Sequence, residues 1–391
     1  MNYKKTGKIL GLLLLCVLVG IFLYQHTQVN TKQKEVANNQ GEEQQETVNF
    51  PKTYKKEVSN LLKFDLDVVV PEGFDSANLY KASATLTSLN QEESYQCFMG
   101  KSTNVNESKD KKGRDWTGEA ENYSVYEDKA GNYLYLSQTN ASYGKNPESA
   151  YIINSFYPDK STDQYNADQF STISDLSFLN REQAWRNVES VLEKMGLDTS
   201  TVQKKTAYSL DWETLKKGEQ CLDVNGNEVE SEKNPNWSKA NEGYYYYIGQ
   251  QYQDLPMYDS LQVMGNLEEG IDTSPLRIFQ GEQGIVSLWL DHWFSMQEQE
   301  EHFQLVPFEQ IMAAVQDKYE GTVKTNPLLV KQAKLYEYPV KEETGDYSLV
   351  PVWICSLEET LDDGEGGTYT HTIQMPISAL TGEELSELEG H

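Results

Sequence analysis

The hydrophobic pattern of the chain begins with one long apolar segment near its first residue. An unbroken apolar run extends over Ile9–Tyr24 and follows three basic residues, Lys4, Lys5 and Lys8. The run is slightly shorter than the ~17–25 residues that usually cross a bilayer, but a lysine and a tyrosine suit its two interfaces. We therefore predict an uncleaved transmembrane anchor, with residues 1–8 in the cytoplasm and the large C-terminal domain outside the cell. The positions assigned to this anchor are Lys4, Lys5, Lys8, Leu12, Leu15, Val19, Phe22 and Tyr24.

Two other interpretations of this segment stay open. A cleaved signal peptide needs small residues before the cleavage site, whereas Leu23 and Tyr24 end the run and the first alanine after it is Ala37. A lipoprotein needs Cys16 to end the apolar stretch, but the residues after it stay apolar. We interpret this cysteine as an inert thiol inside the anchor.

Residues 25–49 follow the anchor and are rich in Gln, Asn, Glu and Lys, with few apolar side chains. Such a segment cannot bury enough apolar surface to offset the entropy lost on ordering. We predict a flexible stalk that holds the rest of the chain away from the membrane.

Alternating apolar and polar positions dominate residues 50–178 and predict a mostly antiparallel β domain. The clearest signal is a hairpin in which the turn Asp128–Asn132 joins strands at Asn122–Tyr126 and Tyr133–Leu136. A short helix is expected at Thr53–Leu62. Further strands are expected at Phe64–Val68, Leu79–Leu89, Tyr95–Met99 and Tyr151–Tyr157.

Residues 179–391 show helical periodicity twice, each time followed by a series of strands. The first helix has Asn180 as its N-cap and stops at Gly196. The second extends over Pro307–Tyr319. This repeated order predicts an α+β architecture of two units, each a helix packed on an antiparallel sheet. The strands are expected at Thr201–Leu210, Gly243–Tyr252, Leu276–Phe279, Gly284–Phe294, Leu328–Tyr338, Tyr347–Cys355 and Tyr369–Ile377.

Three strand-and-turn segments carry a resemblance to a known family. They are Tyr244–Tyr258, with its Asp-Leu-Pro-Met turn, then Gly281–Val286, and Tyr347–Trp353 before a closing Leu-Thr-Gly turn. Together with the anchor and stalk, the segment at about 180–385 resembles the PepSY-like domains of membrane-anchored YycH/YycI-type regulators of Gram-positive bacteria. The resemblance implies a non-enzymatic envelope protein that acts by contact on a sensor kinase or an envelope enzyme.

Charge narrows the class of partner. The chain of 391 residues contains 61 acidic and 33 basic residues, for a formal net charge of −28. Such a domain is repelled by nucleic acid, so we expect no nucleic-acid partner. A basic patch on an envelope protein, a cationic peptide or a metal ion suits this charge better. Outside the anchor only Cys97, Cys221 and Cys355 are present, so at most one disulfide is possible.

Motifs for catalysis and for metal binding are weak. The chain lacks HExxH, GxSxG and P-loop patterns, and two SxxK tetrads, at Ser108–Lys111 and Ser142–Lys145, lie in predicted loops. A zinc pair of His292 and His302 has no helical spacing, and an acidic turn at Asp362–Glu365 lacks the ligand pattern of an EF-hand. We therefore assign no catalytic residue, no metal and no cofactor.

Tyrosine is the one compositional outlier, with 25 residues. In the run Tyr244, Tyr245, Tyr246 and Tyr247, successive side chains point to opposite faces of a strand. Together with Tyr252, an outward row is a candidate binding surface for a wall glycan or a peptide. The leading hypothesis from the sequence remains a regulatory envelope protein, and the glycan- or peptide-binding module is the alternative. An envelope hydrolase that uses carboxylates is a third.

Overall fold

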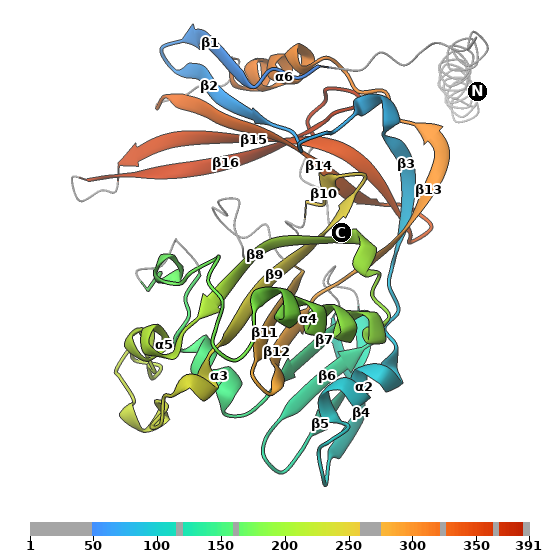
Figure 1. Cartoon of the computed structure of the whole chain (residues 1–391). Coiled ribbons are helices and arrows are strands. Elements are labelled where there is room, and N and C mark those ends of the chain that lie inside the picture. Colours follow the sequence, from blue (N-terminus) through green and yellow to red (C-terminus); the bar gives the residue numbers. More distant parts are fainter. Residues whose placement is uncertain are drawn as a thin grey trace, which may run out of the picture. The chain divides into compact units, whose positions relative to one another are not determined.

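The computed structural model describes residues 49–114, 120–158, 164–258, 275–320, 326–362 and 367–385. The expected anchor at 9–24 and all but the last residue of the expected stalk at 25–49 lie outside these ranges. No helix within these ranges is long and apolar enough to cross a membrane. The described residues belong to one compact unit, which contains two β-sheets (Figure 1).

The first sheet has seven strands in the order β1-β2-β14-β15-β3-β13, with β16 beside β15. All its pairs are antiparallel except β2 with β14. The alternation of the sequence explains the core, because Leu62, Phe64, Leu66 and Val68 of β2 point inward while the residues between them are exposed. The strands are β1 (Thr53–Ser59), β2 (Leu62–Val69), β3 (Tyr80–Leu86), β13 (Phe294–His302), β14 (Leu328–Lys341), β15 (Tyr347–Asp362) and β16 (Thr368–Ser378).

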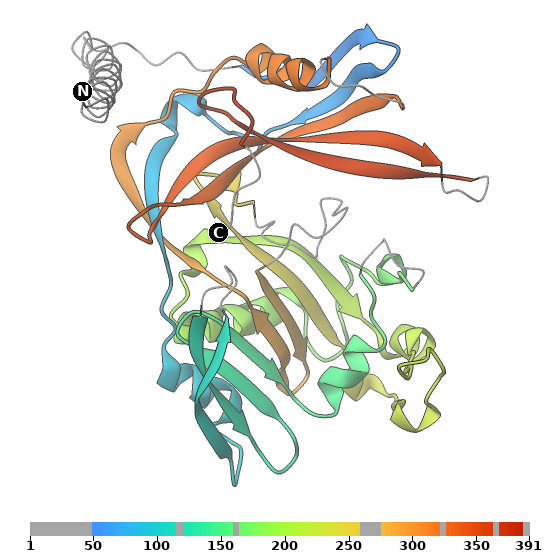
Figure 2. The same cartoon turned by 180° about the vertical axis from the view of Figure 1, so that it is seen from behind.

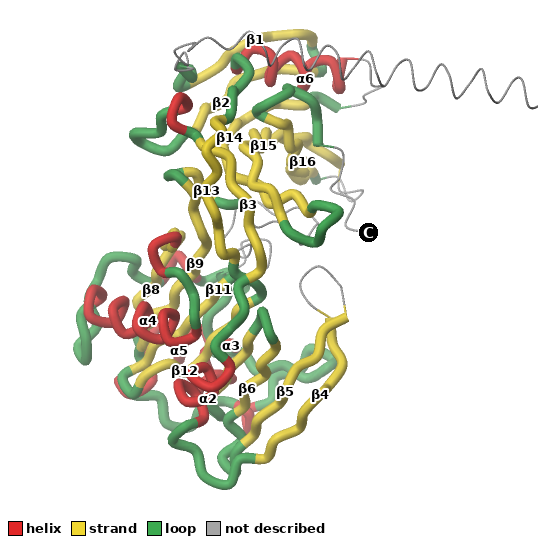
Figure 3. The backbone as a smooth tube through the Cα atoms, turned by 90° about the vertical axis from the view of Figure 1, so that its right-hand side faces the viewer, coloured by secondary structure: helices red, strands yellow, loops and turns green. Residues whose placement is uncertain are grey.

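One helix, α6 (Phe308–Glu320), covers a face of this sheet (Figures 1 and 3). Its buried residues recur at helical spacing, at Phe308, Ile311, Met312 and Val315, and they join the core formed with β2, β14, β15 and β16. The helix predicted from Pro307 is thereby confirmed.

The second sheet has nine strands in the order β10-β9-β11-β12-β7-β6-β5-β4, with β8 beside β9. All its pairs are antiparallel. The predicted hairpin is confirmed, since β5 and β6 pair across the turn at Asp128. The strands are β4 (Asn106–Arg114), β5 (Ala120–Glu127), β6 (Tyr133–Ser137), β7 (Ala141–Gly144), β8 (Val202–Leu210), β9 (Gly243–Tyr252), β10 (Leu255–Pro256), β11 (Leu276–Gly281) and β12 (Gly284–Leu290).

Two helices, α2 (Gln91–Met99) and α4 (Arg181–Met195), pack on one face of this second sheet (Figure 1). The predicted N-cap of α4 is confirmed, because Asn180 accepts a hydrogen bond from the backbone N–H of Gln183. Its predicted end is also confirmed, since Gly196 has a φ of 90°, a conformation that glycine adopts without strain.

The opposite face of the second sheet is covered only in part. At the β8-β9-β11 end, α3 (Glu148–Ile153) and α5 (Trp212–Gly218) contribute to a separate apolar cluster. Seen from behind in Figure 2, this covered end is distinct from the end formed by β4, β5 and β6. Short 3-10 helices complete the described elements: η1 (Ser76–Asn78), η2 (Ala167–Gln169), η3 (Thr199–Thr201), η4 (Glu230–Glu232) and η5 (Lys239–Asn241).

The expected fold class is wrong. We expected an α+β chain with a mostly antiparallel β first domain followed by two PepSY-like helix-plus-sheet units, but the described chain is mostly β, with sixteen strands and five α helices. Both sheets take strands from before and after residue 178, because β2 pairs with β14 and β3 with β13 and β15, while β7 pairs with β12. Sequence periodicity identifies strands but not their distant partners, which is why two local units were expected.

Three local assignments also need correction. The segment at Thr53–Leu62 is strand β1 and not a helix, since it pairs along β2. The segment at Tyr95–Met99 lies in helix α2, and the segment at Tyr151–Tyr157 is the last three residues of α3 followed by a turn, so neither is a strand. In α2 the decisive signal is the N-cap, where Asn90 accepts a hydrogen bond from the backbone N–H of Glu93.

Candidate functional site

The tyrosine run predicted as a binding surface lies in the central strand β9, where neither face is open. Tyr244 and Tyr246 point toward α4 and join its core, while Tyr245 and Tyr247 point toward the cluster around α3 and α5. Only Tyr245 is partly exposed among these four, and Tyr252 is buried as well. The expectation of an outward aromatic row on this strand is wrong, because apolar side chains cover both faces of the sheet at this point.

Two of these tyrosines are held by polar contacts with the protein. The Tyr244 hydroxyl donates to the Leu179 carbonyl at 2.6 Å and accepts from the Leu176 N–H at 2.7 Å. The Tyr252 hydroxyl donates to the Lys81 carbonyl at 3.5 Å. These contacts are structural and present no free hydroxyl to a ligand.

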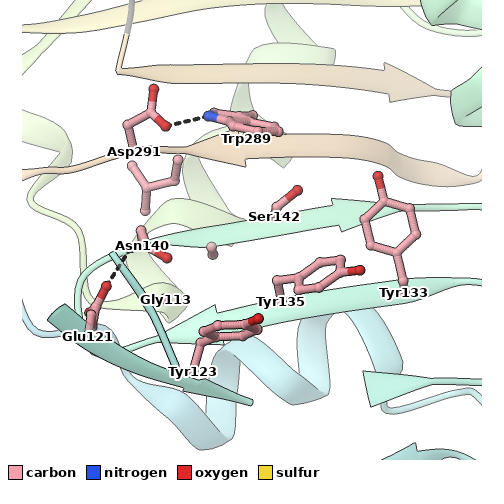
Figure 4. Close-up of a pocket in the computed structure, with 11 residues that line it drawn as sticks. Gly113, Glu121, Tyr123, Tyr133, Tyr135, Asn140, Ser142, Trp289 and Asp291 are labelled. Atoms are coloured by element: carbon pink, nitrogen blue, oxygen red, sulfur yellow. Dashed lines mark hydrogen bonds between the residues drawn. The ribbon is translucent and has the colours of Figure 1, made fainter. Parts of the chain in front are cut away.

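Exposed aromatic side chains gather instead at the uncovered end of the same sheet (Figure 4). They line a groove with a volume of about 540 Å³, within the usual range for ligand pockets. We call it the aromatic groove. Its lining residues are Gly113, Glu121, Tyr123, Tyr133, Tyr135, Asn140, Ala141, Ser142, Trp289, Leu290 and Asp291.

The register of three strands sets the shape of the aromatic groove. Trp289 of β12 is opposite Ser142 of β7, which is opposite Tyr135 of β6. Opposed residues share one face of a sheet, so the two large rings flank a small serine, about 10 Å apart at two strand spacings. Both rings are open to solvent, with exposed fractions of 50% for Trp289 and 43% for Tyr135.

Two glycines position the remaining tyrosines. A Cβ atom at Gly144 would lie 2.5 Å from the Tyr133 ring, and one at Gly113 would lie 2.9 Å from the Tyr123 ring. The absence of a side chain therefore lets each tyrosine ring lie across the neighbouring strand. The rings also pack on one another, since the Tyr135 centroid lies 5.4 Å from that of Tyr133 and 6.1 Å from that of Tyr123.

Trp289 is held in place by two charged neighbours. Its Nε1–H donates to Asp291, and the Arg277 guanidinium lies 5.4 Å from its ring centroid. The Arg277 guanidinium is also 3.9 Å from the second carboxylate oxygen of Asp291. The indole is thus fixed on one side while its other surface remains exposed.

Polar groups lie at the rim of the aromatic groove. The Glu121 carboxylate accepts hydrogen bonds from Asn140 Nδ2 at 2.6 Å, from the Thr139 N–H at 3.3 Å and from Thr139 Oγ1 at 3.2 Å. Figure 4 shows Glu121 on β5 and Asp291 just after the end of β12, around the rings. Carboxylates retain acceptor capacity beyond these bonds, because each has about four lone-pair positions.

The Tyr133 hydroxyl in the groove is neutral. Burial raises the pKa of Tyr133 above its ordinary value, and the neighbouring Tyr135 acts in the same direction, while a hydrogen bond with Ser142 opposes them. A neutral phenol both donates and accepts a hydrogen bond, so it is suited to a ligand rich in hydroxyl groups.

The other candidate chemistry from the sequence is not brought together. His292 is buried beside Phe294, whereas His302 stacks on Tyr80 with ring centroids 3.9 Å apart. Within the described ranges, no group of three or more His, Cys, Asp or Glu side chains is arranged to hold a metal ion. Most of the acidic turn at 362–365 lies outside these ranges.

The remaining reactive groups are dispersed. The SxxK tetrads begin on strands, at Ser108 in β4 and Ser142 in β7, and not on the first turn of a helix. Cys97, Cys221 and Cys355 are all free thiols, the first half-buried and the others buried. Burial raises the pKa of the Cys355 thiol to about 12, as expected of an inert core residue.

The sequence pattern did not identify the residues of the aromatic groove as a binding surface. Tyr123, Tyr133 and Tyr135 alternate on two correctly predicted strands, which is a signal for one shared face. That signal does not say whether the face is covered. Trp289 joins them through β7, a strand far from it in the sequence.

Comparison with known proteins identifies a protein of similar fold but gives no information about activity. No protein-family profile matches the sequence, and no curated protein matches it. The crystal structure of an uncharacterized protein from Eubacterium rectale ATCC 33656 is similar, with a TM-score of 0.57 over 86% of this chain and 94% of that chain. The two sequences are 16% identical, so this chain shares a fold with a solved bacterial protein.

Proposed function

We propose that the protein is a non-catalytic binding protein of the cell envelope and that the aromatic groove holds a glycan chain. The observation that carries the proposal is the pair of exposed, pre-positioned rings of Trp289 and Tyr135, which flank the small Ser142 and have two carboxylates at the rim. A sugar ring presents an apolar C–H face, which stacks on an aromatic ring, and hydroxyl edges, which hydrogen-bond to carboxylates and amides.

Charge supports a neutral glycan over an anionic ligand. Two carboxylates, Glu121 and Asp291, line the groove, and the Arg277 guanidinium beside Trp289 already contacts one of them. A phosphate or a nucleic acid would meet this negative charge and that of the whole chain, −28. A polymer of uncharged, hydroxyl-rich rings avoids that repulsion.

A place outside the cytoplasmic membrane is part of the same proposal. The basic flank and the apolar run Ile9–Tyr24 support a single membrane anchor, with the groove on the outer side. An anchored domain at that position meets the wall glycan and also the extracellular parts of envelope proteins.

The test is calorimetric titration of full-length protein in detergent with uncharged chitin-type oligosaccharides. We expect Trp289→Ala to weaken binding at least tenfold, because the largest stacking surface is lost. Tyr369→Ala is the matched control, since Tyr369 is equally exposed, at 48%, but lies on β16 of the other sheet. Absence of glycan binding, or equal affinity in Trp289→Ala, would rule out the proposal.

A further inference from the structure

The outer edge of β16 is a second candidate binding surface, formed by backbone N–H and C=O groups that point away from β15. Strand β16 pairs with β15 along its whole length, from Thr368 opposite Asp362 to Ser378 opposite Val352. No other described strand pairs with it. The side chains of Thr368, Tyr369 and Thr370 are exposed, so this edge is open to solvent at its N-terminal end (Figure 1).

The direction of the free backbone groups follows from the chain's own C-terminal segment. The Ser378 N–H donates to the Glu383 carbonyl at 2.9 Å, and the Pro376 carbonyl accepts from the Leu385 N–H at 3.0 Å. Even-numbered residues of β16 therefore direct their backbone groups outward. Because the direction alternates along an antiparallel strand, Thr370, Thr372 and Gln374 present outward N–H and C=O groups too.

This edge lacks the charged side chains found on the other edge strands, apart from the two-residue strand β10. Native sheets discourage further pairing by placing charged side chains on edge strands. The edge strands β1, β4, β8 and β13 all contain several charged residues, whereas β16, with the sequence TYTHTIQMPIS, contains no Asp, Glu, Lys or Arg. The edge already accepts an extended segment at residues 383–385, and the unprotected part continues beyond that point.

Acidic side chains on the neighbouring strand β15 indicate which kind of extended segment the edge of β16 would bind. Glu358 of β15 is opposite Thr372, and Glu359 is opposite His371. A residue added outside Thr372 would share a sheet face with Glu358 at two strand spacings, about 10 Å, within reach of a long basic side chain. A second copy of this chain is a poor occupant, because each copy has a net charge of −28.

We propose that the outer edge of β16 is a docking site for an extended, lysine- or arginine-bearing segment of a partner protein. The segment adds as a strand to the seven-stranded sheet, with its backbone bonded to Thr370, Thr372 and Gln374. The docking site is on a different sheet from the aromatic groove, so it stands independently of glycan binding.

The variant Thr372→Pro tests this geometry. It removes one outward N–H and leaves the bonds to β15 intact, as Pro376 does at an equivalent position of the same strand. Thr372→Ala keeps the N–H and is the matched control. Thermal unfolding of both variants establishes that the β15-β16 pair is preserved.

The probe is a set of fluorescent heptapeptides that alternate valine with lysine, compared with peptides that alternate valine with glutamate. Anisotropy titrations use the full-length protein in detergent. We expect the lysine peptides to bind, Thr372→Ala to retain affinity within twofold, and Thr372→Pro to lose at least tenfold. Hydrogen exchange should then slow at the amides of Thr370, Thr372 and Gln374 in the presence of the lysine peptide.

Four results would overturn the proposal. They are absence of lysine-peptide binding, equal binding of the glutamate peptides, equal affinity of Thr372→Pro, and unchanged exchange at the three amides. Concentration-dependent dimerisation that Thr372→Pro abolishes would also overturn it, since it would assign the edge to a second copy of the chain.

Discussion

Two groups of tyrosines in the same sheet have opposite environments. Tyr244–Tyr247 of β9 lie between two apolar clusters, whereas Tyr123, Tyr133 and Tyr135 of β5 and β6 face solvent on one side. Both groups sit in antiparallel strands and both were visible in the sequence. The difference is that α3 and α5 cover the face of the sheet over β9 but not over β6. Cover supplied by distant segments, and not residue type, decides which tyrosines are free to bind a ligand.

The largest expected effect is on stability, in the buried group. Tyr246 is 1% exposed and packs on Trp185, with ring centroids 5.4 Å apart. We expect Tyr246→Ala to lower the free energy of unfolding by about 3–5 kcal/mol, as for other buried aromatic residues. Tyr135→Ala should change it by about 0.5 kcal/mol or less, because that ring is on the surface. Urea unfolding of both variants compares the two groups directly.

A second substitution separates packing from hydrogen bonding at the same position. Among the described residues, the Tyr246 hydroxyl is buried without a hydrogen-bond partner. Tyr246→Phe should therefore leave stability unchanged or raise it by about 1 kcal/mol, since an unsatisfied polar group is removed. A loss comparable to that of Tyr246→Ala would show that the hydroxyl has a hydrogen-bond partner.

Two glutamates in different environments extend the comparison to acidic side chains. Glu121 in the aromatic groove accepts three hydrogen bonds, whereas Glu337 of β14 is 0% exposed and has no hydrogen-bond partner within the described ranges. Burial raises the pKa of the Glu337 carboxyl well above its ordinary value of 4.5. The folded protein therefore holds this proton at pH values where the unfolded chain releases it.

The raised pKa of Glu337 makes the stability of the fold decrease as pH rises. As pH rises above 4.5 toward the folded pKa of Glu337, the stability contributed by the protonated form is lost, by up to about 1.4 kcal/mol per pH unit. Glu337→Gln removes this loss, so its stability advantage over the natural chain should grow from pH 5 to pH 7. Denaturant unfolding at pH 5, 6 and 7 measures the difference, and a constant or shrinking advantage contradicts the burial of an unpaired carboxyl.

A smaller effect is expected from the glycine beneath Tyr133. Gly144→Ala places a methyl group where the ring now lies and so must displace it from the groove. We expect glycan affinity to fall about fivefold, near 1 kcal/mol, with Trp289 unaffected. Gly226→Ala is a control glycine change at an exposed turn with open space around it; it strains the turn, because Gly226 has a φ of +79°, but it should leave affinity unchanged. Equal affinity in Gly144→Ala would mean that Tyr133 takes no part in binding.

The sequence predicted local features well where a residue's role depends on its neighbours in the chain. The caps of α4 at Asn180 and Gly196 and the β5-β6 hairpin are of this kind. Strand partners are not, because β2 pairs in parallel with β14 across more than 250 positions of the chain. The aromatic groove depends on such pairing, since Trp289 reaches Tyr135 only through β7. Four consecutive tyrosines make the run in β9 more conspicuous in the sequence than the tyrosines of β5 and β6. The run is nevertheless the more buried of the two groups.

The central claim is that the exposed tyrosines bind a ligand and the buried run does not. Titration of a chitin-type oligosaccharide into the natural protein, Tyr135→Ala and Tyr245→Phe tests it most directly. The account predicts at least a tenfold loss of affinity in Tyr135→Ala and no change in Tyr245→Phe. A loss in Tyr245→Phe with full affinity in Tyr135→Ala would contradict it and would return the binding surface to β9.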